Sequence, residues 1–212
     1  MMRKNEIPRF DTIFFERYAR ASLIGLVDEQ FSGLHNCDRP DLQDEERSIG
    51  IEVTRAIREN KYVANALINE IAGRKVMDVS DDDWIDVTKY GYGYGLHDNL
   101  IGKIEYNYWA AALPLKRIIE SKVRKVSDGF YGDFRSFGLY VFSKEDLSEE
   151  MVRSSISFIV DLQRDSKKKY TYMYISQINE MFICNLDDAS FEMVKISKAQ
   201  CRKFYNEAIL TG

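Results

Sequence analysis

The stretch that decides the fold runs Arg39-Pro-Asp-Leu-Gln-Asp-Glu-Glu-Arg-Ser-Ile-Gly-Ile-Glu-Val-Thr54. It contains two short segments of strand character, Leu42–Asp44 and Ile49–Thr54, which are separated by the polar run Glu45–Ser48. Two such segments joined by a short polar run are typical of a β-hairpin. The sequence therefore predicts an antiparallel strand pair here.

The alternation of apolar and polar side chains indicates the register of this hairpin. A turn in the middle of the polar run pairs Leu42 with Ile51 on an apolar face. The same register places Asp41 opposite Glu52 on the other face, where we also expect the side chains of Gln43 and Thr54. A slip by one residue would invert the faces of one strand, so the clean alternation supports this register.

Two acidic side chains opposed across a strand pair repel each other. Their Cβ atoms are roughly 4.5–5.5 Å apart, so Asp41 and Glu52 need a cation, a shared proton or solvent. A divalent metal with oxygen ligands meets this need, because Mg²⁺ requires only one or two protein carboxylates. Such a metal can activate water and stabilise charge on a phosphate. The alternative is an exposed hairpin with a solvated polar face.

The same residues carry a resemblance to a known family. Asp38-Arg-Pro-Asp41, followed eleven positions later by Glu52 in Ile49-Gly-Ile-Glu-Val-Thr54, resembles the PD-(D/E)xK nuclease superfamily. The resemblance implies a restriction endonuclease-like αβββαβ core in which Asp41 and Glu52 bind Mg²⁺ or Mn²⁺. It also implies hydrolysis of a nucleic acid, with DNA as the first expectation. Thr54 stands where the family has the lysine that orients the attacking water.

Some members of the superfamily carry this lysine on a following helix, which directs attention to the predicted helix Leu113–Ser127. Lys122 falls within the apolar stripe of that helix, so it must snorkel or find an anion. We expect Lys122 to replace the missing lysine, with Lys125 as the alternate. The other interpretation is a snorkelling lysine on an ordinary basic helix, and the same helix could instead contact phosphates.

Further site residues follow from the resemblance. Members often carry an acidic residue on the first helix that points at the metal, and Glu16 lies on the predicted helix Asp11–Val27. Its alternative role is a surface ion pair with Arg20, one turn later. Gln43 and Thr54 are expected to contact phosphate or to support the metal ligands, and Lys125 to contact substrate.

The remaining predicted elements alternate between helices and strands. The helices are Arg55–Ala72, Leu147–Arg164 and one that opens at Ser197, and the strands are Phe137–Phe142, Tyr170–Ser176 and Met181–Asn185. Gln200 stands where it can close a capping box with Ser197. This pattern predicts an α/β fold, with a mixed central sheet, an early antiparallel hairpin and flanking helices. We expect one domain over residues 1–212, with an insertion at 74–107.

Composition narrows the class of protein. A net charge of −4 does not favour non-specific binding of nucleic acid, although a local basic patch remains compatible with it. The three cysteines include no CxxC pair, which fits a reducing compartment. With no secretory signal and no long apolar stretch, we expect a cytoplasmic protein with no membrane association. A homodimer is expected if both strands of a duplex are cut.

Two other classes of function are compatible with the sequence. One is a catalytically inactive interaction or accessory protein that keeps the nuclease fold, in a defence or phage system, which Thr54 and the acidic charge favour. The other is a small-molecule-binding domain that uses the aromatic and glycine run Tyr90–Gly95.

Overall fold

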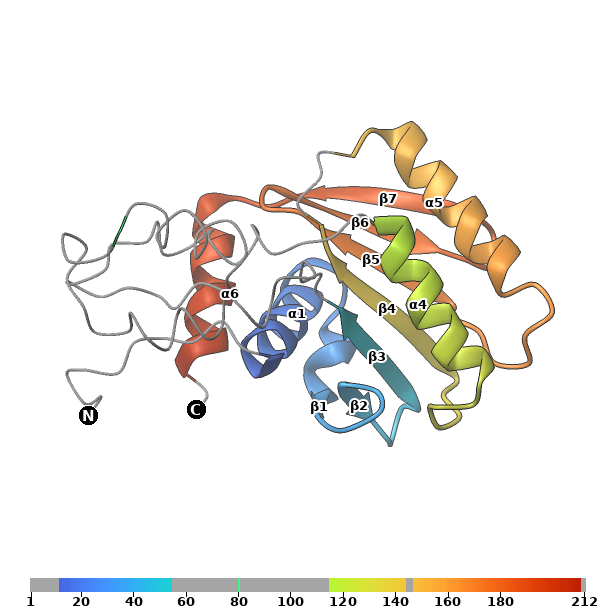
Figure 1. Ribbon diagram of the computed structural model, residues 1–212. Coiled ribbons are helices and arrows are strands. Elements are labelled where there is room, and N and C mark those ends of the chain that lie inside the picture. Colours follow the sequence, from blue (N-terminus) through green and yellow to red (C-terminus); the bar gives the residue numbers. More distant parts are fainter. Residues whose placement is uncertain (1–11, 55–79, 81–114, 144–146, 211–212) are drawn as a thin grey trace.

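The computed structural model describes residues 12–54, 80, 115–143 and 147–210. In these residues a seven-stranded sheet carries helices on both faces (Figure 1). The predicted α/β class with a mixed sheet is therefore confirmed. The predicted helix Arg55–Ala72, the expected insertion at 74–107 and the run Tyr90–Gly95 lie outside the described residues.

The strands follow one another across the sheet in the order in which they occur in the chain. They are β1 (His35–Asn36), β2 (Leu42–Asp44), β3 (Ile49–Thr54), β4 (Ser136–Phe142), β5 (Tyr172–Ser176), β6 (Glu180–Asn185) and β7 (Ser190–Lys195). The three central strands β3, β4 and β5 are parallel, and the other neighbours are antiparallel. The sheet is thus parallel in the middle and antiparallel at both sides.

The hairpin of β2 and β3 has the predicted register. Leu42 pairs with Ile51 and Gln43 with Gly50. Where the pairing of β2 with β3 ends, the Asp41 Oδ2 atom accepts a hydrogen bond from the Val53 amide at 2.7 Å. This backbone donor of β3 is therefore satisfied by a carboxylate instead of a backbone carbonyl of β2.

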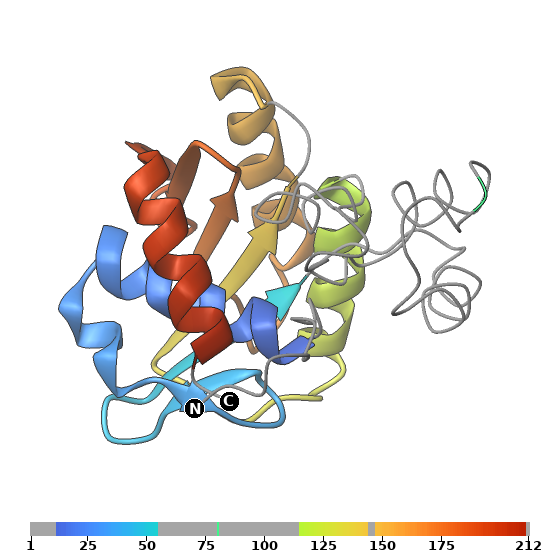
Figure 2. The ribbon, with the colours of Figure 1, turned by 90° about the vertical axis from the view of Figure 1, so that its left-hand side faces the viewer.

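Helices form two layers, one on each face of the sheet, and Figure 2 shows them on either side of the strands. One layer consists of α1 (Thr12–Leu26) and α6 (Lys198–Leu210), the other of α4 (Leu115–Ser127) and α5 (Glu149–Leu162). None of the described helices is both long and apolar enough to cross a membrane.

Each helix layer encloses its own hydrophobic core, and β4 contributes to both. Tyr140 and Phe142 pack toward α1 and α6, whereas Leu139 and Val141 pack toward α4 and α5. This alternation explains why the strand is apolar throughout, as expected of a parallel strand covered on both sides. Glu52, which pairs with Leu139, therefore stands on the side of the sheet that α4 covers.

Helix starts follow the capping rules. Ser197 and Gln200 form the predicted capping box, because the Ser197 amide donates to Gln200 Oε1 at 2.9 Å and the Gln200 amide donates to Ser197 Oγ at 3.2 Å. Ser148 caps α5 by accepting from the Met151 amide. This cap starts α5 at Glu149, two residues later than predicted.

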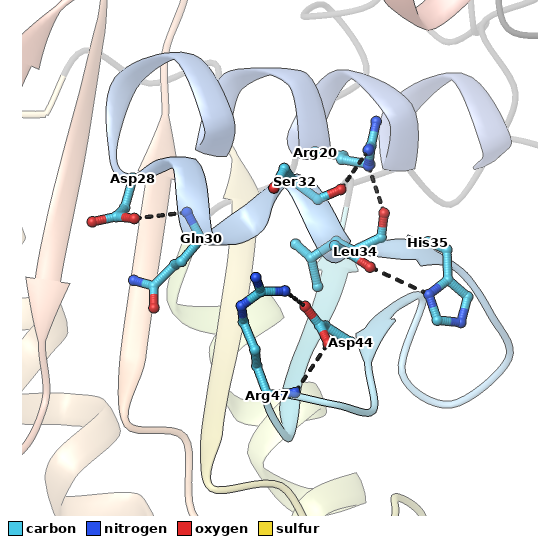
Figure 3. A network of polar contacts seen from close by, with 9 residues as sticks. Arg20, Asp28, Gln30, Ser32, Leu34, His35, Asp44 and Arg47 are labelled. Atoms are coloured by element: carbon cyan, nitrogen blue, oxygen red, sulfur yellow. Dashed lines mark hydrogen bonds and ion pairs between the residues drawn. The ribbon is translucent and has the colours of Figure 1, made fainter.

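A network of polar contacts fixes the path from α1 into β2 (Figure 3). Arg20 of α1 donates to the carbonyl oxygens of Ser32 at 2.8 Å and Leu34 at 2.5 Å. In β2, Asp44 accepts hydrogen bonds from the backbone and the guanidinium of Arg47. The contacts of Arg20 tie the short 3-10 helix η1 (Glu29–Gly33) to α1, and the contacts of Asp44 hold the turn after β2.

Gly33 is confined by this network, because a Cβ atom at this position would collide with Asp44 Oδ2 and stand 2.7 Å from Arg47 Nη1. We expect Gly33→Ala to lower the free energy of unfolding by about 1–3 kcal/mol through overpacking, measured by urea denaturation. Gly132→Ala is the matched control, since its Cβ would meet only the Phe134 ring at 3.5 Å. Equal effects of the two substitutions would contradict this prediction.

Candidate active site

An ion pair between a strand and a helix lies at the centre of the candidate site. Lys122 Nζ of α4 lies 2.5 Å from Glu52 Oε1 of β3. Only 16% of the Lys122 side chain and 6% of the Glu52 side chain are exposed, so both charges are largely removed from water. Such a pair needs good geometry to offset its desolvation.

The sequence of α4 explains why the lysine points this way. Ile119, Val123 and Val126 are buried on the helix face that packs against the sheet. Lys122 lies among them at helical spacing, so its stem is carried inward and its ammonium must meet an anion. Glu52 is that anion. Lys122, rather than the alternate Lys125, makes this contact.

Asp41 is the second acid of the site. It is half-buried, and burial raises the pKa of Asp41 to about 6, with the negative charge of Glu52 as the next cause. The Val53 amide and the charges of Lys122 and Lys125 act in the opposite direction. The two predicted carboxylates are therefore close enough for one to disfavour ionisation of the other, and the nearby cations only partly compensate.

Two tyrosines, which the sequence analysis did not single out, extend this site. Tyr131 follows α4 and is 3% exposed, and burial raises its pKa, with the charge of Glu52 as the next cause. Its hydroxyl lies near Glu52 and Tyr170 but does not reach full hydrogen-bond geometry with either. No motif links these tyrosines to the hairpin, so no sequence signal identified them.

Gln43 makes hydrogen bonds to a neighbouring loop, whereas Thr54 is buried at the end of a strand. Gln43 Nε2 donates to the carbonyl oxygens of Pro40 at 3.0 Å and Asp38 at 3.3 Å. Gln43 thus holds the loop that leads into Asp41. Thr54 is buried at the end of β3, on the same side of the strand as Glu52.

Glu16 is buried on α1, and its Oε2 accepts a hydrogen bond from Asn36 Nδ2 of β1 at 2.7 Å. Arg20, its expected partner in the alternative interpretation, is directed to the carbonyl oxygens of η1 and the residue after it (Figure 3). Among the described residues no group of three or more acidic, histidine or cysteine side chains could hold a metal. Glu16 therefore does not join Asp41 and Glu52 in such a group.

No protein-family model, no curated protein and no solved structure matches this chain. The function therefore has to be inferred from the geometry of the site itself.

Proposed function

We propose that this protein is a metal-dependent nuclease of the restriction endonuclease-like type, which hydrolyses phosphodiester bonds. The contact between Lys122 and Glu52 carries this proposal. Lys122, on the helix α4, contacts Glu52, on the strand β3. Thr54, two residues after Glu52, stands at the position where the nuclease superfamily carries its lysine. Asp41, Glu52 and Lys122 together supply two carboxylates and one cation within a partly buried site.

The order of the described elements supports this class. The described chain runs α1, β1, β2, β3, α4 and β4, which is consistent with the αβββαβ core that the resemblance implies. α1 and α4 lie in different helix layers, and β3 and β4 pair in the middle of the sheet. Both acids and the lysine lie near the β2–β3 side of this core.

The side chains present fit a hard divalent cation. Asp41 and Glu52 offer carboxylate oxygens, and the raised pKa of Asp41 reflects first its burial and then the negative charge of Glu52 beside it. Mg²⁺ is commonly held by one or two carboxylates, with water and substrate phosphate as its other ligands. A Mg²⁺ or Mn²⁺ ion bound by Asp41 and Glu52 would supply Lewis acidity and a water of lowered pKa.

The other groups of the site hold the charged side chains in place and can orient the substrate. Lys122 is kept in place by Glu52, from where its ammonium can bind a phosphate oxygen or orient the attacking water. The Tyr131 hydroxyl, which is neutral at physiological pH, adds a buried polar group near Glu52. The backbone bond from Val53 fixes the Asp41 carboxylate.

Glu52→Gln is the first test of this proposal. We expect it to weaken binding of Mn²⁺ and Mg²⁺ at least about tenfold in calorimetry, because a charged oxygen ligand is lost. Cleavage of single-stranded, double-stranded and branched DNA, and of RNA, should fall to background. Unchanged metal binding in Glu52→Gln would contradict the proposal, as would no binding by the unaltered protein at millimolar metal.

The chain offers a matched control for this test. Glu180 and Lys195 form another carboxylate–ammonium pair, 2.7 Å apart, between β6 and β7. This pair lies at the other side of the sheet from β2 and β3. Glu180→Gln removes the same charge and should leave metal binding and cleavage unchanged.

A second candidate function is a catalytically inactive interaction or accessory protein of this fold. The same ion pair favours it, because Lys122 already neutralises Glu52 without a metal. The two candidates differ in their response to ions. An enzyme with a metal site is stabilised by millimolar Mn²⁺ through mass action, and its unfolding temperature rises with metal concentration. An inactive protein shows no such rise.

A further inference from the structure

An exposed phenylalanine lies between two cations beside the candidate active site. Phe130, just after α4, is 44% exposed. The Arg39 guanidinium carbon lies 4.7 Å from the centroid of its ring, and Lys125 Nζ lies 5.3 Å from it. Cations are attracted to the electron-rich face of an aromatic ring, so these three side chains form one surface cluster.

The backbone around Phe130 holds the ring in a fixed position. Gly129 adopts a positive φ of 73°, its amide donates to the Val126 carbonyl at 3.0 Å, and the Phe130 amide donates to the Lys125 carbonyl at 3.1 Å. This is the Schellman arrangement that ends a helix. The ring also packs edge-on against Tyr131, with centroids 5.2 Å apart. A pre-positioned ring loses little entropy when a ligand binds.

This cluster is continuous with the candidate active site. Arg39 stands two residues before Asp41, in the loop that Gln43 holds through the carbonyl oxygens of Asp38 and Pro40. Lys125 lies one helical turn from Lys122, and its charge acts on Asp41. A ligand on the Phe130 ring would therefore lie beside residues that border the two carboxylates.

The chemistry of the cluster matches one kind of ligand. An exposed ring stacks on a base, and flanking cations bind the phosphates on either side of it. Within a duplex the base faces are already stacked on each other, so only an unpaired base can use the ring. A hydrophobic contact commonly accompanies a Schellman turn, and this explains why Phe130 packs against Lys125. It does not explain the contact of Phe130 with Arg39, which comes from a distant part of the chain.

We propose that Arg39, Phe130 and Lys125 form a platform for single-stranded nucleic acid, with an unpaired base on the ring and its neighbouring phosphates on the two cations. The Arg39 side chain is 58% exposed and lies 3.4 Å from the exposed Asp38 carboxylate, and it exchanges the ring and this carboxylate for a phosphate as the base takes its place. This inference rests on the proposed function only in naming the bound strand as the substrate of the adjacent carboxylates.

Binding without metal tests the platform independently of cleavage. Fluorescence anisotropy in EDTA would compare labelled oligothymidylate of twelve nucleotides with a duplex of equal length. We expect Phe130→Leu, which keeps the apolar contact and removes the ring, to weaken single-strand binding by roughly 5- to 100-fold. Phe130→Tyr should bind within about twofold of the unaltered protein, because the aromatic face is kept. Met193→Ala, at another exposed apolar side chain on β7, should have no effect.

Two further measurements separate stacking from charge. An oligonucleotide with abasic sites should bind equally to the unaltered protein and to Phe130→Leu. Arg39→Gln and Lys125→Met should each lower the slope of log affinity against log salt by about 0.7, the value for one phosphate contact on a single strand. Unaltered affinity in Phe130→Leu, tighter binding of duplex than of single strand, or no single-strand binding would each overturn the platform.

The outcomes also separate this inference from the proposed nuclease function. Loss of single-strand binding in Phe130→Leu, together with no metal binding by the unaltered protein, supports the platform and removes the nuclease. Metal-dependent cleavage that is indifferent to Phe130→Leu in both rate and affinity supports the nuclease and overturns the platform.

Discussion

Lys122→Met is expected to lower the free energy of unfolding by about 3–5 kcal/mol and to abolish cleavage. The substitution keeps most of the apolar stem but leaves the Glu52 carboxylate, 6% exposed, without its cation. Removing one member of a buried ion pair has this large cost, because the remaining charge is desolvated and unpaired. Urea denaturation at neutral pH measures the stability, and a single-turnover assay measures the cleavage.

Two variants make this prediction specific. Lys195→Met breaks the pair with Glu180, in which the lysine side chain is 72% and the glutamate side chain 22% exposed, and should cost less than about 1 kcal/mol, as pairs open to solvent do. The double variant Glu52→Gln with Lys122→Met removes both charges and should regain most of the lost stability while staying inactive. A loss below about 1 kcal/mol in Lys122→Met would show that the pair is hydrated and would remove its role in holding the site.

Asp41→Asn is expected to stabilise the protein by about 3 kcal/mol at pH 8 and to have little effect at pH 4. The pKa of Asp41 is about 6 in the folded protein and near 3.9 in an unfolded chain. A group whose pKa is raised on folding contributes most stability below its unfolded pKa. That contribution is lost as the pH rises through about 6. Asparagine avoids the cost of ionisation and can still accept the Val53 hydrogen bond through its amide oxygen.

The measurement is a series of urea denaturations from pH 4 to pH 8 on the unaltered protein and the variant. Most titrating groups are common to both proteins, so the difference between the two curves reports the ionisation of Asp41 together with its coupling to the neighbouring charges. Asp38→Asn, at a side chain 86% exposed, is the control for the loss of one carboxylate from this loop. A difference for Asp41→Asn that stays flat, or shrinks toward pH 8, would refute the raised pKa.

Because metal and proton compete for this carboxylate, Mn²⁺ affinity should fall about tenfold for each pH unit below 6.

The sequence was sufficient to predict those features that depend on short-range alternation. The pairing of Leu42 with Ile51 followed from the two faces of one hairpin, where an error of one residue would expose the core. For Lys122, a charge within an apolar stripe left two roles open, snorkelling to solvent or contact with an anion, and the structure shows the contact, which is with Glu52. In both cases one strong constraint, the cost of burying the wrong group, left few arrangements open.

Features that depend on long-range packing were not predictable in this way. Tyr131, after α4, and Tyr170, just before β5, come close to Glu52 because both pack into the core between α4 and the sheet. Glu16 was expected at the metal, yet its carboxylate meets Asn36 of β1, a strand of two residues that carries no recognisable pattern. Gln43 was expected to contact phosphate or to support the metal ligands, and the structure shows its amide donating to backbone oxygens of the loop that leads into Asp41.

The strand β7 was missed for a related reason. Ser190–Lys195 lies at the side of the sheet and is mostly exposed, so no apolar face marks it. Its pairing with β6 is visible only in the structure, through the turn in which Asp188 accepts hydrogen bonds from Ser190. A strand held mainly by backbone pairing leaves little trace in side-chain periodicity.

The two outermost described strands also bear on self-association. β1 has only two residues, and β7 presents Glu192 and Lys195 among its exposed positions. Very short edge strands and charged edge strands both disfavour pairing with a strand of another copy. Within the described residues, two copies of this chain should therefore not join by pairing strands at β1 or at β7.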